Sequence, residues 1–169
     1  MIVEPLVLTE GALSGALLSE ITGLYASNRE FHRLSGDFPD PDDIRPGQVA
    51  AAVMDELAQP HAQVLLARSA GKLTGIAATL AHHPDPADPD PWIGLLMVHA
   101  DAQRAGTGRE LAAYVEDGFR RQGRKGVRLA VLENNTAALR FWTATGYLVT
   151  GRSEDRERHR PCAVMRKTL

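Results

Sequence analysis

The chain has 169 residues, with 19 Lys or Arg against 21 Asp or Glu, so its formal net charge is −2. Residues 1–169 fit one domain with a sizeable core, and the balanced charge gives no general attraction to nucleic acid, so we expect no such partner. No apolar run is long enough to cross a membrane. The single Cys162 excludes a disulfide framework and favours a reducing, cytoplasmic compartment, and Met1–Pro5 lacks the flank of a secretory signal.

The first half of the chain predicts three strands and two helices. Residues 6–8 form a short apolar strand, and apolar residues at helical spacing predict helices over 13–25 and 48–59. Residues 28–47 lose this periodicity and contain three prolines, so we expect a long, proline-stiffened connection. Residues 64–67 and 73–80 are strands that a turn at Ala70–Lys72 joins into a hairpin.

The second half begins with a proline-rich loop at 83–91, because alternate prolines exclude both a helix and a central strand. The pattern then predicts strands over 92–98, 127–132, 147–152 and 163–168, with helices over 109–122 and 136–144. The charge-rich residues 154–160 are expected to form a solvated hairpin connection. The whole chain therefore predicts an α/β (α+β) domain of about seven strands and about four helices.

The turn Gln103–Gly108 connects the strand at 92–98 to the following helix. Glycines let backbone N–H groups face outward, and the unpaired donors and dipole of a helix N-terminus attract phosphate. A Walker loop is excluded because Arg109 and Glu110 follow Gly108, and a dinucleotide fingerprint is excluded because Leu111 stands where a small residue is needed. The turn indicates a phosphate-bearing ligand, with an ordinary strand-to-helix turn as the alternative.

Two segments carry a family resemblance. In the first, a strand ends at Val98 and is followed by Gln103-x-x-Gly106-x-Gly108; in the second, an apolar strand leads to Asn135-x-x-Ala138, the pair Phe141-Trp142 and then Gly146-Tyr147. Together they resemble the two signatures of the GNAT superfamily of N-acetyltransferases, over about residues 92–152. The resemblance implies a mainly antiparallel, splayed sheet with flanking helices, and acetyl-CoA as co-substrate without a metal.

The resemblance also implies which residues contact the cofactor. The turn would bind the pyrophosphate, the strand end would pair with pantetheine amides, and the Val98 N–H would face the thioester oxygen. Asn135 either reaches pantetheine or only caps the helix from Thr136, and the two aromatic residues lie beside the thiol or in the core. The implied cofactor-binding residues are Met97, Val98, His99, Gln103, Arg104, Ala105, Gly106, Thr107, Gly108, Arg109, Asn135, Phe141 and Trp142.

The family's usual acid and base are both missing. Trp142 stands where a tyrosine commonly protonates the thiolate, and Gly94 stands where many relatives carry a glutamate base. His82 and His83 are replacement candidates for the general base, since histidine titrates near neutral pH, and the alternative is a pair of loop histidines without a catalytic role. A metal at this pair is excluded because adjacent strand residues point to opposite faces. Weaker candidates for proton transfer are Tyr114, Glu133 and Tyr147.

The acceptor is the least defined part of the prediction. Acidic residues at 37–43 and 85–90 would form an electronegative mouth for a cationic amine if the two loops converge, with solvated acidic turns as the alternative. We expect direct attack of a primary amine, on a small molecule or a peptide, upon the thioester, and leave a homodimer open. Two other functions remain: an acyl-CoA-binding or sensor protein without turnover, and a transferase of a longer acyl group.

Overall fold

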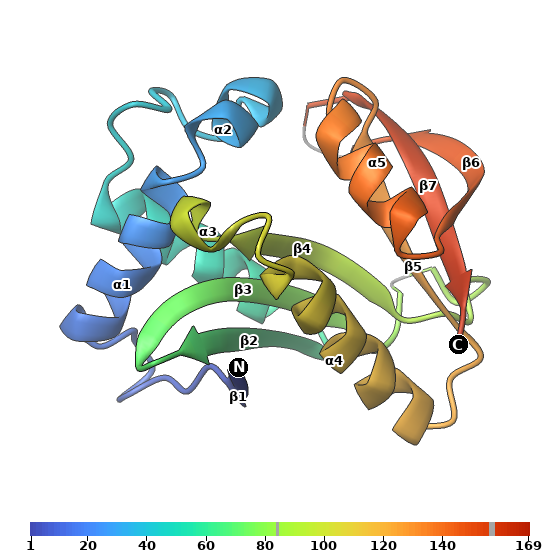
Figure 1. Cartoon of the computed structure of the whole chain (residues 1–169), viewed down its shortest axis with the longest axis horizontal. Helices are drawn as coiled ribbons and strands as arrows, with labels where there is room; N and C mark the ends of the chain where they lie inside the picture. Colours follow the sequence, from blue (N-terminus) through green and yellow to red (C-terminus); the bar gives the residue numbers. More distant parts are fainter. Residues whose placement is uncertain (84, 156–157) are drawn as a thin grey trace.

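The computed structural model describes residues 1–83, 85–155 and 158–169. Within them the chain forms seven strands, five α-helices and a short 3₁₀ helix, Ala100–Ala102 (Figure 1). The strands are β1 Ile2–Pro5, β2 Ala62–Ser69, β3 Lys72–Leu80, β4 Trp92–Val98, β5 Gly126–Leu132, β6 Leu148–Glu154 and β7 Pro161–Thr168. The helices are α1 Gly15–Ala26, α2 Arg29–Ser35, α3 Pro46–Ala58, α4 Thr107–Arg121 and α5 Thr136–Ala144.

The described strands make one sheet in the order β1-β2-β3-β4-β5-β7-β6. Every neighbouring pair is antiparallel except β4 and β5, which are parallel. Alternate strand residues face opposite sides: Leu65 and Ala67 pack in the core under α4 and α5, whereas Val64 and Leu66 pack in the core under α1 and α3. The predicted α/β fold with a mainly antiparallel sheet is confirmed.

Two local expectations were wrong. The first strand is Ile2–Pro5, paired with β2, and not residues 6–8. The connection at 28–47 contains α2, which has only seven residues and whose buried residues, His32 and Ser35, are polar. A helix this short, with a polar buried side, leaves no apolar periodicity for a sequence pattern to detect. The structure therefore has five α-helices where we expected about four.

The sheet opens between β4 and β5. Only Trp92 with Arg128 and Ile93 with Leu129 are in register, after which β4 leaves its parallel neighbour. On the other edge of β4, Ala78 pairs with Leu95 and Thr79 with Ile93, so Gly94 is an extra residue in the strand. Such a bulge bends and twists the strand that contains it. The predicted splay therefore begins at Gly94, and Figure 1 shows β4 and β5 diverging from that end.

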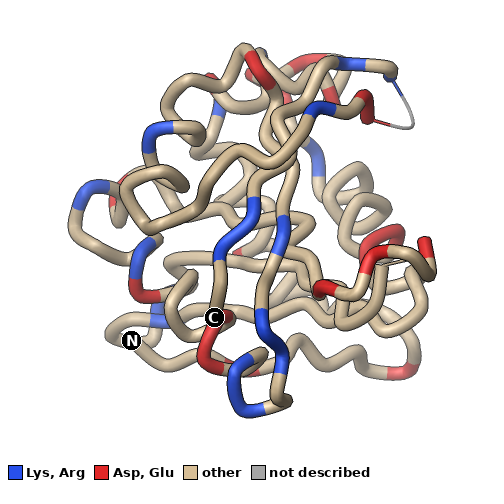
Figure 2. Tube along the Cα trace, turned by 90° about the vertical axis from the view of Figure 1, so that its right-hand side faces the viewer, with Lys and Arg blue, Asp and Glu red and all other residues tan. Residues whose placement is uncertain are grey.

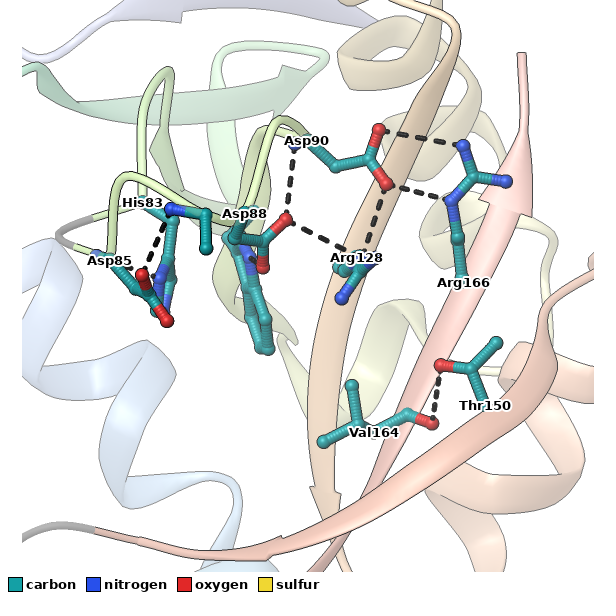
Figure 3. Close-up of polar contacts among 10 residues, drawn as sticks. His83, Asp85, Asp88, Asp90, Arg128, Thr150, Val164 and Arg166 are labelled. Carbon is teal, nitrogen blue, oxygen red and sulfur yellow. Dashed lines mark hydrogen bonds and ion pairs between the residues drawn. The ribbon is translucent and has the colours of Figure 1, made fainter.

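The buried carboxylate of Asp90 connects the strands at the end of the gap where β4 and β5 still pair. Asp90 is 5% exposed and accepts hydrogen bonds from Nε of Arg166 at 2.7 Å and Nε of Arg128 at 3.1 Å (Figure 3). Burial by itself would raise the pKa of Asp90, but hydrogen bonds and positive charge from Arg166 and Arg128 outweigh burial and lower that pKa. The segment before β4 is thus tied to both β5 and β7.

The far side of the gap is bridged by side chains near α2. The Asn134 amide donates to the Leu34 carbonyl at 3.3 Å. Arg160 donates to the Ser35 carbonyl and pairs with Asp37 at 2.9 Å. The two halves of the sheet are therefore joined both at the seam and across the opening. None of the described helices combines the length and apolar character that crossing a membrane requires.

Candidate functional site

The predicted anion turn leads into α4 through Gly106. Gly106 precedes the helix with φ 91°, a left-handed conformation that favours glycine, and a Cβ there would meet no described atom within 4 Å. The N–H of Glu110 makes the first helical bond, to the Gly106 carbonyl. The N–H groups of Thr107, Gly108 and Arg109 therefore have no partner from within the helix. This is the geometry that a phosphate requires.

Charge and packing complete this turn. Among the residues that the structure describes, neither Arg104 nor Arg109 pairs with a carboxylate, and both are exposed. Gly108 brings the start of α4 close to its neighbours, since a Cβ there would lie 3.4 Å from the Phe141 ring and 3.5 Å from Cγ2 of Val98. The turn, the aromatic ring and the end of β4 thus form one continuous surface.

The backbone of Val98 faces the open gap. The N–H of His99 donates to the Thr74 carbonyl at 2.9 Å, on the side of β3. Since successive residues of a strand direct their backbone groups to opposite edges, the N–H and C=O of Val98 point toward the gap. The Val98 carbonyl accepts from Nδ2 of Asn28 at 3.1 Å and from Nε2 of Gln103 at 3.0 Å, which agrees with that direction. Its N–H is directed to the same edge.

Two of the predicted strand-end contacts need correction. The N–H and C=O of His99 are used by Thr74 and by the N–H of Ala102, and Met97 lies opposite Ile76, with its backbone groups directed to β3. The expectation that Met97 and His99 offer backbone groups to a ligand was wrong, because only alternate residues face the gap. The Gln103 side chain is also occupied internally: it donates to Val98 and to Oδ1 of Asn28 at 2.9 Å.

The α5 residues divide between the core and the site. Oδ1 of Asn135 accepts from the Ala138 N–H at 3.0 Å, so the side chain caps α5. Trp142 is buried in the core, with its ring 4.9 Å from those of Phe141 and Tyr147, and we withdraw it as a cofactor contact. Phe141 is only half-buried and lies against Gly108, so it remains at the site.

A cavity of about 220 Å³ lies where β4 leaves β5, on the side of the sheet covered by α3. Oε2 of Glu56 approaches within 3.6 Å of the position that a Cβ on Gly94 would occupy. The sequence did not single out Glu56, because no motif contains it. Only the space that Gly94 leaves free could have indicated that another element supplies a side chain there. The lining residues are Glu56, Gln59, Ala62, Ala78, Thr79, Leu80, His83, Trp92 and Gly94.

The two candidate histidines lie in different surroundings. His83 lines the cavity, its ring 4.9 Å from that of Trp92, and its Nδ1 accepts from the Asp85 N–H at 3.1 Å. His82 is outside the cavity lining, 3.1 Å from the Arg124 guanidinium and stacked edge-on against His61. The structure therefore brings His83 to the cavity and separates His82 from it.

Two of the weaker candidates for proton transfer, Tyr147 and Glu133, are not among the described residues that line the cavity. Tyr147 is fully buried in the core, where burial raises the pKa of its hydroxyl and the charge of Glu116 adds to that effect. Glu133 pairs with Arg152 at 3.1 Å. No group of three or more His, Cys, Asp or Glu within the described ranges is placed to hold a metal ion.

Of the seven acidic residues described in the two loops, five pair with arginines. In the side view of Figure 2, acidic and basic segments lie next to one another around the C-terminus. Asp88 accepts from the Trp92 indole at 2.8 Å and lies 3.5 Å from Arg128, beside the Asp90 contacts (Figure 3). The other paired acids are Asp37 with Arg160, Asp42 with Arg33 and Asp43 with Arg45. These pairings reduce the negative potential that the two loops present to a cation, and a cationic acceptor stays a prediction.

The model of the Acetyltransferase (GNAT) family matches residues 24–147. An acetyltransferase from Thermus thermophilus has a TM-score of 0.74 at 15% identity, covering 100% of this chain and 98% of its own. The ribosomal-protein-S18-alanine N-acetyltransferase from Escherichia coli has a TM-score of 0.66 at 14% identity, covering 99% and 94%.

A third similar structure is an aminoglycoside 6′-N-acetyltransferase complexed with coenzyme A, with a TM-score of 0.66 at 16% identity. The match covers 99% of this chain and 97% of that chain. At these identities the structures establish the fold, while the family match spans most of the sequence. No curated protein matches the sequence.

Proposed function

The chain belongs to the GNAT family of acetyltransferases, and from that premise we propose that it transfers the acetyl group of acetyl-CoA to a primary amine of a small molecule or peptide. The observation that carries this proposal is the open edge of β4 beside the N-terminus of α4. The Val98 N–H is directed to a gap in the sheet, and the N–H groups of Thr107, Gly108 and Arg109 have no partner from within the helix.

The residues around this gap suit the chemistry of the donor. The α4 turn with Arg104 and Arg109 would hold the pyrophosphate, and the open edge of β4 before Val98 would pair with a pantetheine amide. Acetyl-CoA supplies an activated acyl group as a thioester. When an amine attacks that carbonyl, negative charge develops on its oxygen, and a fixed N–H such as that of Val98 typically lowers such a barrier by about 3 kcal/mol.

Binding of the donor is tested by calorimetry with acetyl-CoA. We expect Gly106→Glu to abolish binding, because the new carboxylate would occupy and repel the anion site. Gly123→Glu is the matched control: Gly123 follows the other end of α4, also has a positive φ and also faces open space, so it carries the same backbone strain. Equal affinity of wild type and Gly106→Glu would overturn the cofactor assignment.

Turnover is tested separately by following thiol release with spermidine, kanamycin, free amino acids and short peptides. Release with any of them supports the transferase. Tight acetyl-CoA binding without release across the panel would favour a protein that binds the cofactor without turnover. A larger rise in melting temperature with a longer-chain acyl-CoA than with acetyl-CoA would instead identify a different acyl donor.

A further inference from the structure

We propose that Glu56 of α3 is the general base that takes a proton from the acceptor amine, an inference that rests on the proposed function. Nothing in the sequence motifs assigns a role to this residue. The proposal comes from where the fold places its carboxylate.

The position of Glu56 follows from two neighbouring features. Gly94 is the extra residue at which β4 bends away from β5, and it presents no side chain to the cavity. The Glu56 carboxylate enters that space from α3, with Oε2 at 3.6 Å from the absent Cβ of Gly94. A carboxylate oxygen therefore lies beside Gly94, where the gap begins, and Gly94 belongs to the same strand as the Val98 N–H.

The other groups of the cavity favour Glu56 over His83. Among the described residues that line the cavity, the titratable side chains are those of Glu56 and His83. The Nδ1 of His83 is an acceptor for the Asp85 N–H, and its ring packs on Trp92, which fixes it against the wall. Gln59, one turn after Glu56 at the end of α3, is a neutral hydrogen-bonding partner for a bound acceptor. A carboxylate is also the group that attracts an ammonium ion into such a cavity.

Other charged or titratable groups face Glu56 from the surrounding elements. Tyr25 of α1 is buried, and burial first and the charge of Glu56 second raise the pKa of its hydroxyl, so Tyr25 stays neutral beside the carboxylate. Asp37 adds to the same effect on Tyr25. Because a neutral tyrosine cannot supply the negative charge that accepts a proton, the carboxylate of Glu56 is the base in this group.

The proton transfers balance as follows. The ammonium of the acceptor loses one proton to the Glu56 carboxylate, directly or through one water, and the freed lone pair attacks the thioester carbon. The carbon–sulfur bond breaks with its electron pair on sulfur. The second proton of the nitrogen passes to the thiolate, giving the N-acetylated product and coenzyme A, and Glu56 returns its proton to solvent.

The test compares Glu56→Gln with wild type, using whichever amine of the panel the wild type acetylates fastest. Removing a general base typically costs 10²–10⁴-fold, so we expect kcat/KM at pH 7 to fall at least about 100-fold. The variant can use only amine already deprotonated in solution, and the pKa is about 10.4 for a lysine-type amine and about 8 for an α-amine. Its kcat/KM should therefore rise about tenfold per pH unit up to about one unit below the pKa of the amine used, while that of wild type changes little over the same range.

Two further variants keep the result interpretable. Asp55→Asn removes the same charge from the preceding, exposed residue of α3 and should leave rate and pH profile unchanged. Glu56→Asp retains a carboxylate and should keep the flat profile even where its rate falls. Acetyl-CoA affinity and melting temperature, measured on all variants, show that the fold and the donor site are intact.

The inference fails if Glu56→Gln stays within threefold of wild type, or if its loss is the same at every pH, because a positioning role would produce that pattern. It fails equally if His83→Gln, and not Glu56→Gln, acquires the steep profile. A wild-type protein that binds acetyl-CoA but acetylates none of the amines would overturn the proposed function, and the inference with it.

Discussion

Nδ2 of Asn28 lies 3.1 Å from the carbonyl oxygen of Val98, although the two residues are 70 positions apart in the sequence. Asn28 follows α1, and Val98 ends β4. Gln103 donates to the same carbonyl and to Asn28, so three residues from separate segments form one network. This network fixes the last peptide of the strand just before the chain turns toward α4. The orientation of the Val98 peptide therefore depends on the side chains of Asn28 and Gln103.

Asn28→Ala and Gln103→Ala should each lower kcat more than they weaken acetyl-CoA binding, because the strand end loses a donor that fixes its direction. Each lost hydrogen bond should reduce the free energy of unfolding by about 0.5–1.5 kcal/mol. A double-mutant cycle should give non-additive losses, since the two side chains also contact each other. Gln63→Ala, at an exposed position on β2, is the control. Strictly additive, independent losses would contradict a shared network.

Trp142→Phe should lower the free energy of unfolding by about 1–3 kcal/mol, as expected for a reduced side chain in a packed core, without changing the dissociation constant of acetyl-CoA. The reason is that Trp142 packs against Tyr147 inside the core and not against the gap. Phe141→Leu is the paired variant, because Phe141 contacts the site at Gly108, and it should weaken acetyl-CoA binding. Urea unfolding and calorimetry measure the two quantities. Weaker binding by Trp142→Phe alone would return Trp142 to the cofactor site.

Asp90→Asn should destabilise the fold by about 1–3 kcal/mol at pH 7, because a buried acceptor of two arginine hydrogen bonds loses its charge. The pKa of Asp90 is lowered in the folded state, so its stabilisation is complete above the unfolded value of about 4 and is lost as the pH falls through the folded value. The difference between variant and wild type should therefore shrink in acid. Unfolding curves at pH 7, 5 and 3 give the comparison, and a constant difference would exclude ionised Asp90 as the cause.

Saturating acetyl-CoA should protect the backbone amides of the open part of β4 more than those of β2 and β3, which already have partners on both sides. At 100 times the dissociation constant, binding adds about 2.7 kcal/mol, which corresponds to a rise in melting temperature of about 5–10 °C for a chain of this length. Hydrogen exchange and thermal unfolding test this together. Uniform protection over the whole sheet would argue against binding at the β4 edge.

The sequence predicted the parts of this fold whose signals are local. The strand at 92–98 and the helix at 136–144 have the predicted bounds, because apolar runs, a capping Asn135 and glycines set them without help from distant residues. The anion turn was predicted for the same reason. The helix α2 was missed because tertiary contacts, and not its own pattern, bury His32 and Ser35.

The site was predictable only where one motif contains it. Glu56 reaches the cavity from α3 because Gly94 leaves room for it. The two residues are 38 positions apart on different elements, so no sequence spacing indicates that they meet. The pairing of the acidic loops could not be predicted for a related reason: arginines from β5, β7 and other segments pair with them, and only the folded chain brings those partners together.

The parting of β4 from β5 has a consequence for the working cycle. A sheet interrupted in its middle has edges that water must satisfy, and a linear molecule rich in amides is the natural substitute for the missing hydrogen-bonding neighbour. The acyl donor would thus supply the missing hydrogen-bonding partner of the sheet when it binds, and that partner would be lost when coenzyme A leaves. In each turnover the gap between β4 and β5 would be filled and then emptied. The rigidity of the fold would therefore affect the rate of coenzyme A release more than the rate of acyl transfer.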